Sequence, residues 1–242
     1  MLSLDLHAHT RFFHGHKRAA RAFDPIGHRL LAGVARRRDL DGVALTNHDY
    51  YRPLGDPTGE SGLLSLPGIE ISTTRGHVVV LGADPPSRTE PGRLTPQEAV
   101  DLAHERGCVA IIAHPFRNST IRETDVAFDA IELNGKHPRT WPLVRQIAEN
   151  RGIPLVGGSD AHYPVEIGRA YTHVDAEPDP EAIVEAIRDG RVEPALADDP
   201  FARLVRRGYR HVHRYKGHLT DATPGVGESP GEGERENEND AG

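Results

Sequence analysis

Histidine is the residue that stands out in this chain, with 15 copies among 242 residues. Its neutral imidazole is the commonest metal ligand in proteins. Many of the histidines stand in short motifs that also contain a glutamate or an aspartate, and carboxylates bind the same divalent cations. The candidate metal ligands are His7, His9, His14, His48, Glu70, His77, His114, Asp160 and His162.

The first two candidates form an H-x-H pair directly after the apolar run Leu2–Leu6. Side chains two positions apart on a strand point to the same face, so His7 and His9 can reach one ion. Imidazoles and carboxylates without a thiolate favour Zn, Mn or Fe. The set is too large for one ion, and we expect two to three divalent metal ions. Glu70 could bridge two of them, and ions about 3.5–4 Å apart can hold a phosphate and activate a water.

Short apolar or β-branched runs alternate with helical patterns, which is typical of βα units with parallel strands. The expected strands are Leu2–Leu6, Gly42–Thr46, Leu66–Ser72, His77–Gly82, Val109–Ala113, Ala130–Leu133, Pro154–Gly157 and Ala170–Val174. The expected helices are Pro25–Arg38, Thr95–Arg106, Trp141–Asn150 and Asp179–Arg188. About seven such units in one chain favour an α/β barrel over an open sheet.

Most candidate ligands occupy the same position relative to these strands. Nearly all of them lie at the C-terminal end of an expected strand or shortly after it, whereas His77 opens a strand. Functional groups gather at this end of the strands in α/β barrels. A single histidine is more often an ordinary surface or core residue. The whole set in register with the strand ends therefore indicates a metal centre.

These motifs resemble, in content and order, those of the PHP (polymerase and histidinol phosphatase) family over roughly residues 2–195. They read His7-Ala-His9-Thr10, Thr46-Asn-His48-Asp49, Pro67-Gly-Ile-Glu70, Gly76-His77 to Leu81-Gly82, Ala113-His114-Pro115 and Gly158-Ser-Asp160-Ala-His162. The resemblance implies an α/β fold, a distorted (β/α)7 barrel of the PHP type, with up to three metals. It also implies hydrolysis of phosphate esters, among them histidinol phosphate, nucleotide phosphates and nucleic acid ends.

Carried over to this chain, the resemblance implies three ligand sets. They are His7, His9, Glu70 and Asp160 for one ion; Glu70, His77 and His114 for a second; and His14, His48 and His162 for a third. The family often has an aspartate where His14 stands, so His16 is a competing candidate in that loop. Asn47 replaces another aspartate of the pattern, which we expect to change a contact behind the ligands.

Further side chains near the strand ends could touch the substrate. Arg117 follows Ala-His-Pro-Phe and could grip a phosphate bidentately, so we place it with Glu70 and Asp160 among the catalytic candidates. Asp49 is expected to orient His48 rather than bind a metal. Lys136 lies just past a strand end, Glu132 and Asn134 at the same strand end could hold the ligands from behind, and Arg169 is similar; a surface or structural role is the favoured alternative for these four. A structural role is expected for His28, His104 and His173.

Composition favours a soluble cytoplasmic protein without membrane contact. The lone Cys108 excludes a disulfide framework and a cysteine-based zinc finger, and it fits a reducing compartment. No apolar run approaches the roughly 18 residues that span a bilayer, and Met1–Asp5 lacks the features of a signal peptide. The net charge of −7 does not favour nucleic acid as a partner. The sequence leaves the oligomeric state open.

The chain divides into three parts. Residues 1–200 form the expected PHP phosphoesterase domain, residues 201–216 a basic segment, and residues 217–242 an acidic tail with too few apolar residues to become ordered. The aromatic residues Phe201, Tyr209 and Tyr215 are interspersed among the basic residues of the middle part, which could contact nucleic acid phosphates and bases. A solvated terminal helix is the favoured alternative, because the acidic tail would compete for the same charges.

The most direct functional reading is a metal-dependent hydrolase of phosphate esters, in which a di- or trinuclear centre activates water. Its substrate would be a small phosphomonoester or a nucleotide phosphate. One alternative is a 5′–3′ exonuclease acting on DNA or RNA ends with the same centre. Another is a non-catalytic, metal-binding regulatory module, which the complete ligand set argues against. The sequence does not identify the physiological substrate or metal.

Removal of residues 217–242 should leave the melting temperature and the activity almost unchanged, because this part has few apolar groups to bury. Thermal unfolding and turnover of the shortened protein, compared with the full chain, measure this directly. A loss of several degrees would mean that the tail docks on the domain.

Overall fold

The computed structural model describes residues 1–10, 25–53, 62–117 and 119–198. His14 and His16, the basic segment and the acidic tail lie outside the described residues. The strands are β1 (Leu2–Ala8), β2 (Gly42–Leu45), β3 (Leu64–Thr73), β4 (Gly76–Leu81), β5 (Val109–Ile112), β6 (Ala130–Asn134), β7 (Leu155–Gly158), β8 (Ala170–Val174) and β9 (Val192–Leu196). The α-helices are α1 (Pro25–Arg37), α2 (Pro96–Glu105), α3 (Trp141–Arg151) and α4 (Pro180–Arg188).

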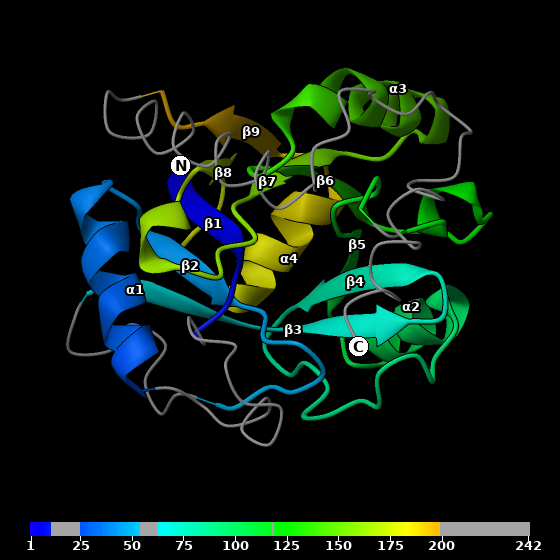
Figure 1. Ribbon diagram of the computed structural model, residues 1–242, viewed down its shortest axis with the longest axis horizontal. Helices are drawn as coiled ribbons and strands as arrows, with labels where there is room; N and C mark the ends of the chain where they lie inside the picture. The colour runs from blue at the N-terminus through cyan, green and yellow to red at the C-terminus, as the bar shows by residue number, and fades with distance from the viewer. Residues whose placement is uncertain (11–24, 54–61, 118, 199–242) are drawn as a thin grey trace, which may run out of the picture.

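The strands form one sheet in the order β7-β6-β5-β4-β3-β2-β1-β8-β9, which curls into a nearly closed barrel (Figure 1). Two groups of neighbours are parallel, β1-β2-β3 and β5-β6-β7. Strand β4 runs antiparallel to both β3 and β5, and β8 runs antiparallel to β1 and β9. The expected α/β barrel is therefore confirmed, while the expectation of parallel βα units holds for only part of the sheet.

The reversal at β4 has a simple cause in the length of its connection. Only Thr74 and Arg75 separate β3 from β4, whereas a parallel crossover needs about a dozen residues or more. The strands form a hairpin, in which the Thr73 hydroxyl donates a hydrogen bond to the Gly76 carbonyl at 2.6 Å. Strand β9, which sequence reasoning missed, pairs with β8 at the edge of the sheet and places Pro194 opposite Thr172.

The helices cover the sheet through three apolar clusters. Helices α2 and α3 pack with β3 to β6, α4 shares a cluster with side chains from β1 to β8, and α1 packs with β1 and β2. Helix α2 begins as its sequence predicts, because Thr95 and Glu98 form a reciprocal capping box ahead of Pro96. In the described residues, no helix combines the length and apolar character needed to cross a bilayer.

The end of β7 closes the barrel against β8 and β1. The backbone amide of Gly157 donates to the Thr172 hydroxyl at 2.8 Å, and that hydroxyl donates to the Gly157 carbonyl at 2.9 Å. Next along the chain, the Ser159 amide donates to the Asp5 carboxylate at 2.9 Å. The first and the seventh strand therefore end side by side, which brings the motifs that follow them together.

Substituting Gly157 by alanine should destabilise the domain by about 1–3 kcal/mol, the usual cost of inserting a methyl group into a packed interior. A Cβ atom at this position would lie 2.3 Å from the backbone oxygen of Tyr171, which cannot swing away as a side chain can. Urea denaturation of the two proteins measures the difference in free energy of unfolding. Gly33→Ala is a matched control, because a Cβ atom there meets nothing within 4 Å.

Candidate metal centre

The fully buried carboxylate of Glu70 lies at the centre of the histidine cluster. Its Oε2 atom is 3.2 Å from Nε2 of both His7 and His9 and 3.1 Å from Nδ1 of His48. Its Oε1 atom is 2.7 Å from Nδ1 of His77 and 3.0 Å from Nε2 of His114. Each oxygen of one carboxylate thus faces a separate group of imidazoles, which is the arrangement that a bridging ligand requires.

Asp160 forms a second carboxylate of the cluster, beside the first. Its Oδ1 atom is 3.5 Å from Nε2 of His9 and 3.1 Å from Nδ1 of His162. Its Oδ2 atom faces two cations, with Arg117 at 3.1 Å and Lys136 at 3.4 Å. One oxygen of Asp160 therefore faces the imidazole cluster, and the other faces the side chains of Arg117 and Lys136, which we call the cationic edge.

The barrel topology explains why these side chains meet. The C-terminal ends of β1, β2, β5 and β7 carry His9, His48, His114 and Asp160 in the residues that follow them. Strand β4 runs the opposite way, so its first residues lie beside the ends of its neighbours, and the Ala113 amide donates to the His77 carbonyl at 3.2 Å. His77 joins the cluster from the start of a strand for this reason.

Backbone strain is concentrated at the same rim. Four described residues other than glycine have positive φ angles, which are uncommon for such residues. Three of them, Asp49, His114 and Asp160, lie at this rim with φ angles of 57°, 26° and 50°, and the fourth is Asp39 before β2. Such conformations persist where the surrounding structure enforces them, and they collect at functional sites. Here they turn the chain so that side chains at the strand ends face the cluster.

Unpartnered polar atoms test whether this cluster fits a metal. His7 Nε2, His9 Nε2, Glu70 Oε2 and Asp160 Oδ1 are all buried, and none has a hydrogen-bond partner among the described residues. Burying such atoms without partners is costly. These four atoms belong to the residues that the family resemblance assigns to one ion, and their chemistry fits a divalent cation held by nitrogen and oxygen.

The donor atoms fall into three overlapping groups, in each of which they lie within 4.8 Å of one another. The groups are His7, His9 and Glu70; His48, Glu70 and His77; and His9, His48 and His162. The third group brings His48 and His162 together, as the resemblance implies for a third ion. His14, the remaining member of that set, lies outside the described residues.

The cations and imidazoles around Glu70 and Asp160 lower the pKa values of both carboxyl groups. Burial raises the pKa of Glu70, but His48, His7 and His77 outweigh it and hold that pKa well below its usual value. Burial acts in the same direction on Asp160, and Lys136 and His162 lower its pKa well below the usual range. Both carboxylates therefore stay ionised.

The pKa values of the histidines in the cluster shift in different directions. Burial lowers the pKa of His7, but Glu132 and Glu70 together raise it well above its usual value. Burial lowers the pKa of His48 well below the usual range, and lowers that of His162 to about 4. The last two imidazoles are consequently neutral near pH 7 and free to bind a cation, whereas a proton competes for His7.

Comparisons with known proteins agree with this geometry. The family model "PHP-associated" matches residues 142–192. The crystal structure of PsfC from Pseudomonas syringae PB-5123 superposes with a TM-score of 0.69 at 19% identity, covering 87% of this chain and 98% of that one. A two-domain protein from Bacteroides vulgatus, described as containing a predicted PHP-like metal-dependent phosphoesterase, gives 0.57 at 22% identity over 81% of this chain and 64% of that one. The chain has a PHP-type fold.

Two further matches extend this result. The lesion-specific endonuclease PfuEndoQ from Pyrococcus furiosus gives a TM-score of 0.57 at 20% identity, covering 80% of this chain and 57% of that one. In sequence, the uncharacterized protein MJ1587 of Methanocaldococcus jannaschii is 28% identical over 165 residues, which are 63% of this chain and 92% of that protein. The family-model match and the PHP-like protein from Bacteroides vulgatus agree with the resemblance to the PHP family, and the endonuclease shares the fold.

Behind the ligands, the PHP fold supplies side chains that hold them in place. Asn47 accepts hydrogen bonds from the Thr10 amide and hydroxyl at 3.0 and 3.1 Å, which ties the end of β1 to the loop after β2. Asp49, which we expect to orient His48, has a carboxylate that accepts from the amide and hydroxyl of Ser72 and from the hydroxyl of Thr89. These bonds fix the backbone of the loop that carries His48.

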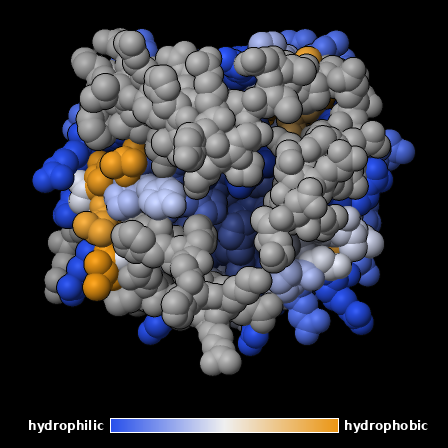
Figure 2. Space-filling model, viewed as in Figure 1, coloured by the Kyte–Doolittle hydropathy of each residue, from blue (hydrophilic) through white to orange (hydrophobic). Residues whose placement is uncertain are grey.

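Several further sequence-predicted residues have clear places in the PHP fold. Arg117 and Lys136 lie beside Asp160, as described above, while Arg169 pairs with Glu166 at 3.5 Å. His104 pairs with Asp129, and His173 contacts Ser3, on other parts of the barrel. Figure 2 shows hydrophilic residues lining a recess near the middle of one face of the molecule.

Sequence reasoning missed three residues near the centre. Asp5 is buried and accepts from the amides of Ser159 and Gly168, while burial raises its pKa to about 6. Glu166 accepts from the His162 amide at 2.7 Å. His137 lies among Arg117, Asp160 and His114, and mainly burial lowers its pKa to about 3. Of these, Asp5 had a usable signal, because a charge inside an apolar strand needs a buried partner.

Proposed function

We propose that this protein is a metal-dependent phosphoesterase that hydrolyses a small phosphomonoester or a nucleotide phosphate. The observation that carries the proposal is the position of Glu70, whose two carboxylate oxygens each face a different group of imidazoles within 3.2 Å. The PHP-type fold supports it, since the Bacteroides vulgatus protein with the same fold is described as a predicted PHP-like metal-dependent phosphoesterase.

Two to three divalent ions would be held by the clustered side chains. His7, His9, Glu70 and Asp160 would hold one ion; Glu70, His77 and His114 a second; and His48 and His162, with His14 from outside the described residues, a third. When bound, such ions lower the pKa of a coordinated water and neutralise charge on a phosphate. The donor set suits zinc, manganese or iron.

The remaining chemistry falls to the side chains around the cluster. Arg117 is half exposed and contacts Asp160 Oδ2, so its guanidinium can turn toward a phosphate oxygen without leaving the site. Lys136 is more buried and contacts the same oxygen, which places a second positive charge on that edge. The ionised carboxylate of Glu70 lies between the imidazoles, of which His7, His9 and His114 are buried, while His48 and His77 are partly exposed and can meet a substrate.

A nuclease activity is the second candidate, and the PHP-type fold of the endonuclease PfuEndoQ is the observation that favours it. The net charge of −7 argues for the smaller substrate, because nucleic acid binding relies on an excess of positive charge. The cationic edge of Arg117 and Lys136 would serve a terminal phosphate in either case.

A single screen tests the proposal. Purified protein, reconstituted with Zn²⁺, Mn²⁺ or Fe²⁺, is incubated with phosphomonoesters, nucleoside bisphosphates and end-labelled oligonucleotides. Metal-dependent release of phosphate from small esters supports the proposal, while shortening of the oligonucleotides alone would favour the nuclease. Failure to hydrolyse any of these substrates, with metal bound, would point to the non-catalytic module.

A further inference from the structure

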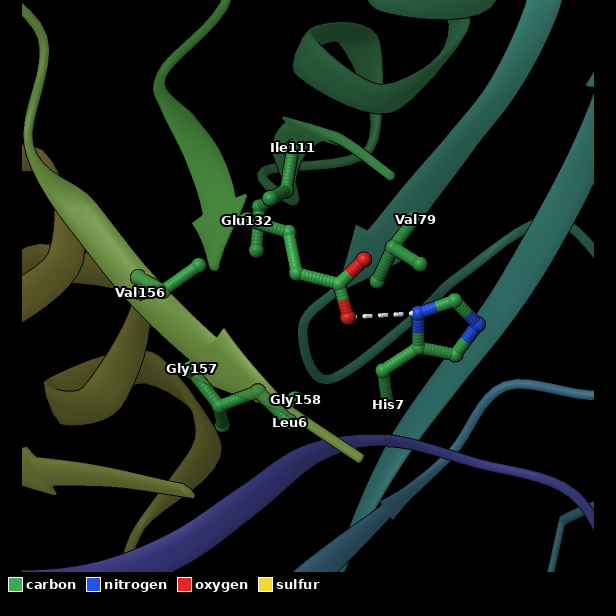
Figure 3. Close-up of a pocket in the computed structure, with 8 residues that line it drawn as sticks. All are labelled: Leu6, His7, Val79, Ile111, Glu132, Val156, Gly157 and Gly158. Carbon is green, nitrogen blue, oxygen red and sulfur yellow. Dashed lines mark hydrogen bonds and ion pairs between the residues drawn. The ribbon is translucent and has the colours of Figure 1, made fainter. Parts of the chain in front are cut away.

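Glu132 on β6 is another buried carboxylate near the centre, and it contacts the imidazole cluster from the side away from Glu70. Its Oε1 atom lies 2.9 Å from Nδ1 of His7 (Figure 3). Its Oε2 atom accepts the backbone amide of His114 at 2.7 Å and the side-chain amide of Asn134 at 3.1 Å. Glu132 therefore holds both the imidazole ring of His7, on β1, and the backbone of His114, which follows β5.

The contact with His7 decides which ring nitrogen of that histidine carries a proton. A carboxylate can only accept a hydrogen bond, so Nδ1 must be the donor. A metal ion would therefore bind at Nε2 in exchange for a proton, and Nε2 is the atom that faces Glu70 at 3.2 Å and has no hydrogen-bond partner among the described residues. This is the arrangement in which an imidazole is ready to bind a metal, with a carboxylate behind it fixing the ring.

The contact with His114 acts on the backbone. His114 has a φ of 26°, which is unfavourable for a residue with a side chain, and its amide is directed at Glu132 Oε2. Because of that turn, His114 Nε2 reaches Glu70 Oε1 at 3.0 Å. Glu132 thus supports one imidazole on each side of Glu70.

The surroundings of Glu132 are mostly apolar apart from the side chain of His7. Glu132 borders a small pocket whose other walls are mostly apolar, formed by Leu6, Val79, Ile111, Val156, Gly157 and Gly158 together with His7. No lysine or arginine of the described residues forms an ion pair with it. A Cβ atom on Gly158 would lie 2.4 Å from Glu132 Oε1 and 2.6 Å from His7 Cβ, so the glycine leaves room for the pair.

We propose that Glu132 is a positioning residue for the metal centre, which couples the His7 side and the His114 side of Glu70. The inference rests on the proposed function in so far as the cluster must bind metal. A buried carboxylate in apolar surroundings is costly unless it is fully hydrogen-bonded, and here every hydrogen bond goes to a ligand residue or to the neighbouring Asn134. Glu132 therefore sets the affinity for metal on both sides of the bridge.

Glu132→Gln is the sharpest test, because it keeps the size of the side chain and removes one of its two acceptors. One of the two donors, His7 Nδ1 or the His114 amide, would then face an NH2 group. We expect the affinity for Zn²⁺, measured by competition with a chromophoric chelator, to fall about 10- to 100-fold, the usual effect of losing a partner behind a metal ligand. In the zinc-loaded protein, the downfield proton signal of His7 Nδ1 should shift or disappear.

Asp129→Asn is a matched control within the same chain. Asp129 Oδ2 also accepts from an imidazole, His104 Nε2 at 2.8 Å, and from a backbone amide, Ala110 at 2.7 Å, but neither partner belongs to the cluster. The control should lose some stability and keep wild-type zinc affinity. If Glu132→Gln also kept that affinity and the His7 signal, the positioning role would be overturned while the phosphoesterase proposal stood. A wild-type protein that bound no metal would overturn both.

Discussion

Replacing Glu70 with glutamine should remove at least one metal ion per chain and reduce turnover by several orders of magnitude. Five imidazoles lie within 3.2 Å of its two oxygens, and a neutral amide offers one acceptor and no charge to the cations between them. Closely spaced dications would then be poorly compensated, and the water between them would keep a higher pKa. Elemental analysis and initial rates with the best substrate of the screen measure the two effects.

His28→Gln is the control for this experiment, since His28 lies on α1 and not in the cluster around Glu70. It should have nearly wild-type metal content and activity, and circular dichroism should show the fold of both variants to be intact. Full metal content and near-normal hydrolysis in Glu70→Gln would refute the bridged centre, whatever the family resemblance implies.

Removing the metals with a chelator should lower the melting temperature strongly. Buried nitrogen and oxygen atoms of His7, His9, Glu70 and Asp160 would be left without partners. A ligand present at about 1,000 times its Kd stabilises a protein by about 4 kcal/mol. For a domain of this size, each kcal/mol corresponds to about 2–4 °C. We therefore expect a decrease of the order of 10 °C per tightly bound ion, measured by calorimetry with and without chelator.

Readdition of Zn²⁺, Mn²⁺ or Fe²⁺ should restore the melting temperature at two to three ions per chain. The affinity should be weaker at pH 6 than at pH 7.5, because protons compete for His7, whose pKa is raised by Glu132 and Glu70 despite its burial. Fewer than one ion per chain after reconstitution, or an unchanged melting temperature, would contradict a multinuclear centre.

Periodicity and turn residues were sufficient to predict most elements of the barrel, because each of these features is local. Thr95 and Glu98 mark the start of α2, and Gly152, with a φ of 65°, ends α3. The direction of β4 was also predictable in principle. Only four residues separate the expected strands Leu66–Ser72 and His77–Gly82, which is too short for a parallel connection.

The contacts behind the ligands could not be predicted from the sequence, since they join residues that are distant along the chain. The Asp5 carboxylate and the Ser159 amide are 154 residues apart, and Glu132 is 125 residues from His7. No spacing rule links such pairs. The partners of Asp49 were not predictable for a related reason, because Ser72 and Thr89 lie on other segments of the chain.

The same long separations make metal uptake an indicator of completed folding. Strand β1 carries His7 and the residues after β7 include Asp160; five strands separate β1 from β7 in the order of the sheet, and the two meet where the barrel closes. A nascent chain that is still being synthesised, or one cleaved within the barrel, lacks at least one wall of the site. Tight metal binding therefore becomes available only to the finished barrel, and partly folded chains would hold cations no better than an ordinary histidine-rich peptide.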